Sequence, residues 1–280
     1  MLVIKKLGWL LAIFGTIAAL LLIIILCNAF AGIHSVTYTL PAKGLGGGLR
    51  LALVTDLHSS RYGARQERLM RALAANEPDV VLLCGDIFHA ANSFRQATVF
   101  LNAVGKAYPC YFVFGNHEYG TRKIQEIRDI LETAGIPILE GQCPRFTANG
   151  QSIRIAGVDD VRHSYRNYAE QLSLVAESIQ KTEEFCVLLS HQPQYIPELL
   201  DTGADLILSG HTHGGQWSIP GMVNGFYAPD QGLFPKYAGG LYKFDAQTLI
   251  ISRGLSKWPL WIPRFFTPRE LVFVDLVQEN

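Results

Sequence analysis

The stretch LRLALVTDLH, residues 49–58, is an apolar run that ends in an aspartate and a histidine, Asp56 and His58. A short apolar run of this kind is typical of a strand that is buried on both faces of a sheet. A single polar residue after a strand is usually an ordinary turn residue that bonds to the nearby backbone. Whether Asp56 and His58 have a chemical role therefore depends on which residues come after the other strands of the chain.

The rest of the chain repeats this arrangement, with apolar runs separated by helical patterns. Short apolar runs predict strands, and spacings of three and four residues between apolar positions predict helices. The predicted strands are 49–55, 79–85, 110–115, 151–158, 185–191, 204–210 and 270–277, with a hairpin over 239–254. The predicted helices are 64–76, 92–107, 122–135 and 168–181. The alternation of strand and helix predicts an α/β fold with a parallel core sheet covered by helices.

Side chains able to bind metal follow five of these predicted strands. The segments are TDLH, GD, GNHE, LLSH and GHTH, and their candidate residues are Asp56, His58, Asp86, Asn116, His117, His191, His211 and His213. In open α/β sheets, ligands bind outside the carboxyl ends of the strands. Five such groups at equivalent strand ends indicate one common site rather than five unrelated turns.

The donor types narrow the chemistry of this site. Oxygen and imidazole donors without thiolates suit Mn²⁺, Fe, Zn²⁺ or Co²⁺. The candidates other than His117 are too many for one ion and suit two ions, which two-metal sites hold about 3.5–4 Å apart with a bridging ligand such as a carboxylate. Asp56 and Asp86 are the only carboxylates among the candidates. Two dications would therefore keep about two net positive charges and attract a phosphate.

The motifs D-x-H, GD, GNHE, H and GHTH, all present and in this order, resemble those of the calcineurin-like metallophosphoesterase superfamily. The resemblance covers roughly 49–280. It implies a four-layer α-β-β-α sandwich, in which two mixed β-sheets are flanked by helices and a binuclear centre lies at the strand ends. It also implies a metal-dependent hydrolase of phosphoric esters or pyrophosphates. We expect its cofactors to be two divalent metal ions, with Mn²⁺ favoured and Zn²⁺ or Fe as alternatives.

The same resemblance assigns a role to each candidate. The residues resemble ligands of the first ion (Asp56, His58, His213), the bridge between the ions (Asp86), ligands of the second ion (Asn116, His191, His211), and the histidine that protonates the leaving oxygen or steadies the transition state (His117). A non-catalytic protein with this fold would be expected to lack some of these ligands. None is missing here.

The N-terminus predicts a membrane anchor. No charged residue occurs from Leu7 to Ile33, and about 20 apolar residues suffice to span a bilayer as a helix. A cleavable signal peptide is the alternative, since AFA at 29–31 resembles a cleavage site, but the apolar core is longer than such peptides have. We therefore expect a transmembrane helix over 1–33, a glycine-rich linker that forms a loop over 34–48, and a metallophosphoesterase domain over 49–280.

These features predict a single-pass protein of the bacterial cell (inner) membrane, held by the lipid bilayer, and the flanking charges leave its orientation open. The anchor, with TDLHS, GNHEYG, GVDD and GHTHGGQ, resembles a bacterial membrane-anchored subgroup that includes chlamydial-type UDP-2,3-diacylglucosamine pyrophosphatases and related phosphodiesterases. We expect hydrolysis of a phosphodiester or pyrophosphate bond in a lipid-linked, phosphate-containing substrate. An extracytoplasmic phosphodiesterase acting on cell-envelope phosphoesters is the alternative.

Fewer signals concern the substrate. His89 and His163 are candidates for substrate contact, although ordinary polar loops account for both, and Asp159 is a candidate to orient a ligand imidazole. The aromatic and basic stretch 256–270, with Trp258 and Trp261, either completes the core or forms an interfacial patch that dips into the lipid headgroups or holds an acyl chain. The balance of 24 Lys+Arg against 24 Asp+Glu argues against a nucleic-acid partner.

Overall fold

A computed structural model of the protein describes residues 2–30, 32–257 and 264–279. The helices are α1 (Leu2–Phe30), α2 (Glu67–Ala74), α3 (Arg95–Ala107), α4 (Asn116–Gly120), α5 (Ile124–Thr133), α6 (Tyr165–Gln180) and α7 (Ile196–Leu200), with 3-10 turns η1 (Pro193–Tyr195) and η2 (His213–Gly215). The strands are β1 (Ile33–Ala42), β2 (Leu49–Val54), β3 (Val80–Cys84), β4 (Cys110–Val113), β5 (Arg145–Ala148), β6 (Gln151–Gly157), β7 (Cys186–Leu189), β8 (Leu206–Ser209), β9 (Tyr227–Ala228), β10 (Gly232–Leu233), β11 (Gly240–Phe244), β12 (Gln247–Ile251) and β13 (Arg269–Gln278).

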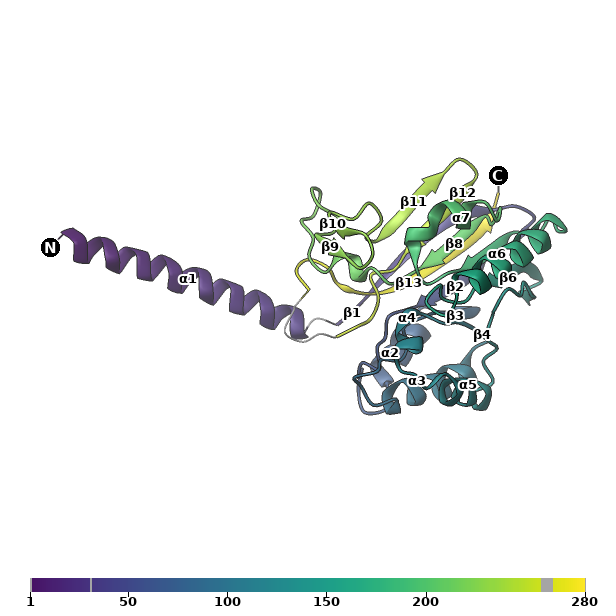
Figure 1. The fold of residues 1–280 in the computed structure, drawn as a ribbon, viewed down its shortest axis with the longest axis horizontal. Coiled ribbons are helices and arrows are strands. Elements are labelled where there is room, and N and C mark those ends of the chain that lie inside the picture. The colour runs from purple at the N-terminus through teal and green to yellow at the C-terminus, as the bar shows by residue number, and fades with distance from the viewer. Residues whose placement is uncertain (1, 31, 258–263, 280) are drawn as a thin grey trace.

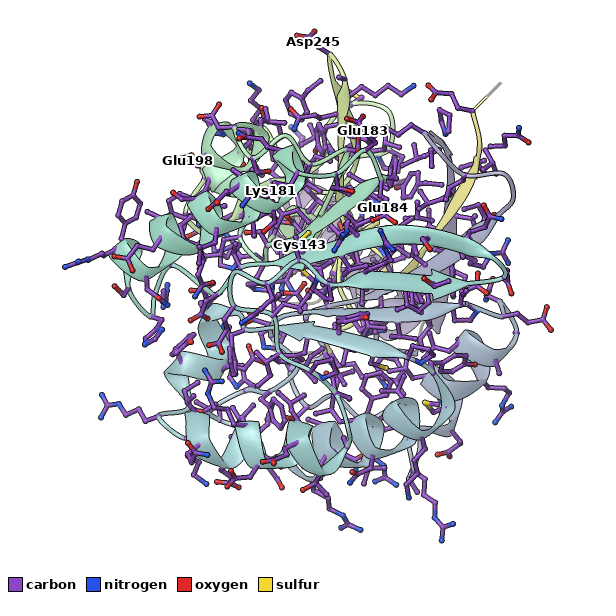
Figure 2. All side chains as sticks on the ribbon, turned by 90° about the vertical axis from the view of Figure 1, so that its right-hand side faces the viewer. Cys143, Lys181, Glu183, Glu184, Glu198 and Asp245 are labelled. Carbon is purple, nitrogen blue, oxygen red and sulfur yellow. The ribbon has the colours of Figure 1, made fainter. Side chains whose placement is uncertain are left out.

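Two main sheets, both mixed, lie between helices (Figures 1 and 2). The first has the strand order β1-β13-β2-β3-β4, in which β13 runs antiparallel to β2 and parallel to β1. The second has the order β11-β12-β8-β7-β6-β5, with β11 and β5 as antiparallel edge strands. The predicted α/β fold with two mixed sheets flanked by helices is therefore confirmed.

The core explains why the central strands read as continuous apolar runs. Along β2, Leu51 and Leu53 pack between the two sheets, while Ala52 and Val54 pack against the helices on the outer face. Both sets are fully buried, so neither face of the strand can be polar. Truncating a fully buried leucine such as Leu53 to alanine would cost roughly 2–5 kcal/mol of stability.

The segment before Leu49 differs from the predicted loop. Residues 33–42 form β1, which pairs in parallel with β13 along its whole length. The inward side of β1 carries Val36, Tyr38, Leu40 and Ala42, whereas the residues between them are exposed. This period of two is the pattern of a half-buried strand, and the loop prediction is wrong for this part of the chain. Turns and bends occupy only 43–48.

The predicted membrane anchor requires a correction. Helix α1 extends away from the two sheets (Figure 1), but within the described residues no helix is both long and apolar enough to cross a bilayer. The predicted transmembrane helix, and the predicted location in the bacterial cell membrane, are therefore wrong.

Candidate metal centre

The two sheets bring their strand ends to one place. Asp56 and His58 follow β2, Asp86 follows β3, and Asn116 and His117 begin α4 after β4. In the second sheet, His191 follows β7, and His211 and His213 follow β8. Backbone hydrogen bonds join these loops, including Asp56 N–H to the Gly85 carbonyl at 3.1 Å and His58 N–H to the Asp86 carbonyl at 2.9 Å.

Two groups made up of predicted ligands form at this edge, and a third group joins His58 to His89 and His117. Of the first two, one contains Asp56, His58 and His213, and the other contains Asp86, His191 and His211, with the ligand atoms of each group within 4.8 Å of one another. Asp86 lies between the groups, because its Oδ2 is 3.6 Å from His58 Nε2 and 3.1 Å from His191 Nε2. Asn116 lines the same cavity as Asp86. The structure thus brings all seven predicted ligands together, and their individual roles stay predictions.

Several polar atoms of the site have no hydrogen-bond partner in the protein. Within the described residues, buried atoms without a hydrogen-bond partner include both ring nitrogens of His58, Asp86 Oδ2, Asn116 Oδ1 and His191 Nε2. Unpaired buried polar atoms are rare in folded proteins and call for an explanation. Oxygen and imidazole donors gathered in one place fit a pair of divalent cations. Two such ions would hold a phosphoryl group and make water nucleophilic.

Hydrogen bonds orient two of the imidazoles as ligands. His191 Nδ1 lies 2.8 Å from the Cys84 carbonyl, which can only accept, so Nδ1 carries a proton and Nε2 faces the cluster. Burial opposes the charged ring, but the nearby Asp86 raises the pKa of His191 to about 10, so Nε2 of the metal-free protein also carries a proton, which a bound ion would displace. His211 Nε2 lies 2.9 Å from the Asp230 carboxylate, which leaves Nδ1 for an ion. Asp230 was not among the predicted site residues, because it lies in the turn between β9 and β10, outside every signature segment.

His213 has a different environment. Its Nδ1 lies 3.1 Å from the guanidinium of the buried Arg264, and a guanidinium only donates. The neutral ring therefore carries its proton on Nε2, which lies 3.8 Å from Asp56 Oδ1. A neutral imidazole binds an ion through its unprotonated nitrogen, so an ion at Nε2 would need the other tautomer, with the proton on Nδ1. Burial lowers the pKa of Arg264 to about 10, so the guanidinium stays charged at neutral pH.

Asp86, at the predicted bridge position, is a buried carboxylate whose charge is stabilised by its neighbours. Burial alone would raise the pKa of Asp86, but the surrounding imidazoles, His191 foremost, hold it well below its usual range. The carboxylate is therefore ionised at neutral pH although it is only 1 % exposed. Such a buried charge persists only with strong partners.

The backbone at the site adopts an unusual conformation. Asp56, His58, Asp86, His211 and His213 all have positive φ, between 48° and 70°. A non-glycine residue in this left-handed region costs roughly 1–2 kcal/mol. The neighbouring chain also passes very close, since a Cβ at Gly210 would lie 2.5 Å from Asp56 Oδ2. The glycine before His211 is thus required for the close approach of these two strand ends.

His117 stands beside the bridge on the open side of the site. Its ring Nε2 lies 4.0 Å from Asp86 Oδ2, its backbone N–H donates to Asp86 Oδ1 at 2.8 Å, and its side chain is 36 % exposed. Burial lowers the pKa of His117 to about 4. The ring of His89 stacks on His117 with centroids 4.6 Å apart. His117 therefore faces the open side of the site, where it could donate a proton or a hydrogen bond to a bound substrate.

Glu118 ties the loops of β3 and β4 together. Its fully buried carboxylate accepts the backbone N–H groups of Asp86, Phe88 and Gly115 at 2.8–2.9 Å. Burial and the charge of Asp86 raise the pKa of Glu118 to about 8. The glutamate of GNHE thus positions the bridge and Asn116 without lining the cavity, a role that sequence patterns do not reveal.

The candidates for substrate contact lie differently. His163 Nδ1 is 2.9 Å from Asp159 and its ring stacks on Tyr119. Asp159 also accepts the Tyr119 hydroxyl at 2.6 Å. Asp159 does not orient a ligand imidazole, so that prediction is wrong; the carboxylate in this role is Asp230. Trp258 and Trp261 lie outside the described residues.

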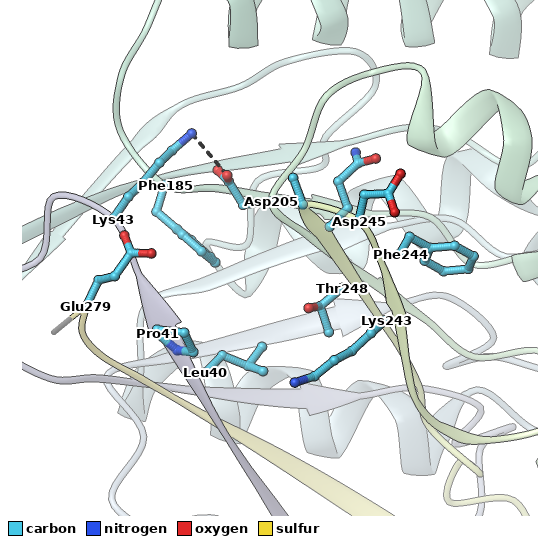
Figure 3. A pocket seen from close by; sticks show the side chains of 12 residues that line it. Leu40, Pro41, Lys43, Phe185, Asp205, Lys243, Phe244, Asp245, Thr248 and Glu279 are labelled. Atoms are coloured by element: carbon cyan, nitrogen blue, oxygen red, sulfur yellow. Dashed lines mark ion pairs between the residues drawn. The ribbon is translucent and has the colours of Figure 1, made fainter.

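A cavity of about 350 Å³ opens onto the site and is lined by Asp86, Asn116, His117, Gly120, Arg162, His211, His213 and Pro229. A larger cavity of about 520 Å³ lies elsewhere, beside the ends of β1 and β13 and the β11–β12 hairpin, and includes the ion pair Lys43–Asp205 (Figure 3). None of the predicted ligands lines the larger cavity. The smaller cavity is therefore the one through which a substrate could reach the predicted ligands.

The fold and the site define a metal-dependent hydrolase of phosphoesters. The family model for calcineurin-like phosphoesterases matches residues 49–215, and the chain belongs to this family. An uncharacterised metallophosphoesterase of Bacillus subtilis, YkuE, is 26% identical over 88% of this chain and 85% of its own. The phosphodiesterase YaeI of Escherichia coli is 28% identical over 81% of this chain and 82% of its own.

Solved structures show the same fold at lower identity. The NAD nucleotidase of Haemophilus influenzae matches with a TM-score of 0.51 and 18% identity. The match covers 73% of this chain and half of the nucleotidase chain. At this identity the likeness concerns the architecture alone.

Proposed function

We propose that the protein hydrolyses a phosphodiester or pyrophosphate bond in a lipid-linked substrate, with UDP-2,3-diacylglucosamine as the specific compound to test and Mn²⁺ as the ion. The observation that carries the hydrolytic part is the position of Asp86 between two groups of imidazoles whose buried atoms lack partners. A donor set of oxygen and nitrogen without sulfur is compatible with Mn²⁺.

The protein's own residues supply what a phosphoester hydrolase needs around its ions. His191 and His211 are oriented by the Cys84 carbonyl and Asp230, so little reorganisation is needed when a phosphoryl group binds. His117 faces the same cavity and can donate a proton to the oxygen that leaves. Its low pKa favours the neutral ring before substrate binds, and an anionic phosphoryl group would favour the protonated ring.

An apolar lobe beside the centre supports a substrate with an apolar part. We define the apolar lobe by its exposed side chains, Trp217, Ile219, Met222, Leu233, Phe234 and Phe266. The lobe is continuous with the site, because η2 contains His213 and the β9–β10 turn contains Asp230. A cavity of about 410 Å³ in the lobe is lined by 218–224 with Phe266. Exposed apolar surface beside a polar site suits an acyl chain.

The hydrolytic part is tested with bis(p-nitrophenyl) phosphate and added Mn²⁺. We expect turnover that EDTA abolishes, and losses of at least about 100-fold in kcat/KM for Asp86→Ala and His117→Ala. His34→Ala, at an exposed histidine on β1, is the matched control and keeps wild-type activity. Folded wild-type protein that binds no Mn²⁺ in elemental analysis and hydrolyses no phosphodiester would overturn the proposal.

The lipid-linked part is tested with an acylated substrate and its unacylated counterpart. We compare hydrolysis of UDP-2,3-diacylglucosamine with that of the same nucleotide sugar lacking both acyl chains. The variant Met222→Ser/Leu233→Ser should raise KM about 30-fold for the acylated compound only, because each of the two exposed apolar side chains contributes roughly 1 kcal/mol of contact. Leu174→Ser, at an exposed leucine on α6, is the control. Equal activity toward both compounds in wild-type protein contradicts this part alone.

A further inference from the structure

The loop after β6 is held firmly above the metal centre. Asp159, within it, accepts the hydroxyl of Tyr119 from α4 at 2.6 Å, and its backbone N–H donates to Gln171 of α6 at 2.7 Å. Asp160 accepts Nε2 of Gln192, the residue after His191, at 2.8 Å. The loop is therefore anchored on both sides of the site, to the helix that begins with Asn116 and to the segment that carries His191.

Arg162 is the residue that this loop presents to the cavity. Its backbone N–H donates to Asp160 Oδ1 at 2.8 Å, which fixes the turn. Among the described residues that line the 350 Å³ cavity, Arg162 carries the one permanent positive charge. Across the described part of the chain, no carboxylate pairs with its guanidinium, whereas the nearby Arg166 pairs with Glu170 at 2.9 Å.

An exposed arginine that is held by its backbone and lacks an acidic partner is suited to an anion from solution. The guanidinium presents a planar fork of donors that matches two oxygens of one phosphate. The phosphoryl group under attack is already the one that Asp86 and the imidazoles would hold through their ions. A charge at Arg162 in the same cavity is therefore available for a second anionic group.

We propose that Arg162 binds a second phosphate of the substrate, adjacent to the phosphate that is attacked, and so selects pyrophosphate esters over simple phosphodiesters. This inference rests on the proposed function, because it assumes that the protein hydrolyses phosphoric esters. The binding of pyrophosphate by Arg162 can be measured without any turnover. Arg162 then acts as a specificity residue. Its contribution appears in KM for a pyrophosphate ester, whereas kcat for a singly charged diester does not depend on it.

The test compares inorganic pyrophosphate with inorganic phosphate on Mn²⁺-loaded protein by calorimetry. A charge-assisted contact of this kind corresponds to roughly a 10- to 100-fold change in Kd. We expect Arg162→Ala to weaken pyrophosphate by that factor and phosphate by less than about twofold, with Arg162→Lys in between because it loses the fork. Arg166→Ala, at a side chain that is 90% exposed, is the matched control and should bind both anions as wild type does.

The kinetic arm uses the nucleotide sugar and bis(p-nitrophenyl) phosphate with the same variants. KM for the pyrophosphate ester should rise in Arg162→Ala, while kcat/KM for the diester stays within about twofold of wild type. Equal weakening of phosphate and pyrophosphate would overturn the proposal by placing Arg162 on the attacked phosphate, and so would unchanged binding of both. A protein that binds pyrophosphate through Arg162 yet hydrolyses nothing would refute the proposed function and leave this inference standing.

Discussion

At the level of single residues, the behaviour of a ligand imidazole depends on the group that bonds its second nitrogen. His191 relies on a backbone carbonyl, which no substitution removes, whereas His211 relies on the side chain of Asp230. Asp230 is 43 % exposed and lies in a short turn. Of these two imidazoles, His211 should therefore be the more easily misoriented by a change distant in sequence from the signature motifs.

Replacing Asp230 tests this dependence. Asp230→Asn keeps the shape of the side chain but removes the charge that orients His211, and we expect the affinity for Mn²⁺ at one of two sites to fall about 10- to 100-fold. Calorimetric titration of the metal-free protein measures both sites. Asp245→Asn, in the β11–β12 turn, is the control. Unchanged affinity at both sites would show that Asp230 does not support His211.

Asp160 should make the stability of the folded protein depend on pH. This carboxyl is 3% exposed and burial raises its pKa to about 6, compared with about 3.9 in an unfolded chain. The folded protein therefore holds the proton more tightly than the unfolded chain. The resulting stability is fully present below about pH 4 and is lost as the pH rises through about 6.

Between pH 4 and pH 7, we expect the free energy of unfolding of the metal-free protein to fall by roughly 2–3 kcal/mol because Asp160 loses its proton. Asp160→Asn should remove this part of the decline. Urea unfolding of both proteins across this pH range measures it, with Asp201→Asn at an exposed carboxyl as the control. Parallel curves for wild type and Asp160→Asn contradict the assignment.

At the level of elements, strand β13 shows what holds the first sheet together. It comes last in the chain but lies between β1 and β2, with Val272 and Val274 fully buried between the two sheets. The family model ends at residue 215, so it includes neither β12 nor β13. A domain cut at that boundary would expose the edges of β2 and β8 to other chains.

Removing β13 should therefore prevent folding. A chain that ends at residue 268 loses the strand that pairs with both β1 and β2, and we expect it to be unfolded or aggregated by circular dichroism and size-exclusion chromatography. A chain that ends at Gln278 keeps the strand and should behave as the full chain does. A soluble monomer with native spectrum from the shorter chain would refute this account of the sheet.

Sequence patterns predicted the central strands and missed the elements at the margins. Strands such as β3 and β7 are buried on both faces, so their apolar runs are unmistakable. Strand β1 was predicted as a loop because its alternation is interrupted by Pro41 and followed by glycines, while its partner β13 lies more than 200 residues away. The short β9–β10 ribbon has no periodic signal at all, yet it carries Asp230.

At the level of the whole molecule, the centre is the meeting point of two sheets. Asp56, His58 and Asp86 come from the first sheet and His191, His211 and His213 from the second. The motifs could be predicted from the sequence because each follows an apolar strand. Arg264, Asp230 and Arg162 could not, because their positions depend on long-range packing that no local spacing encodes. Ions at this junction would join the two sheets.

Metal binding should stabilise the folded protein as a whole. A ligand at 100 times its Kd adds about 2.7 kcal/mol per site when it binds only the folded state. We expect Mn²⁺ to raise the melting temperature and EDTA to reverse the rise, as measured by thermal unfolding. The rise should be smaller in Asp86→Ala, which loses the bridge. An identical rise in wild type and Asp86→Ala would mean that the ions bind elsewhere.

The left-handed backbone at the ligand positions has a consequence for protein engineering. Five residues of the centre hold a conformation that glycine adopts without penalty. In the metal-free protein, a replacement such as His58→Gly would relieve roughly 1 kcal/mol of backbone strain. Each gain would remove a ligand. Backbone stability and metal binding thus make opposite demands at the same few positions. Any screen for a more stable variant must therefore also measure metal binding.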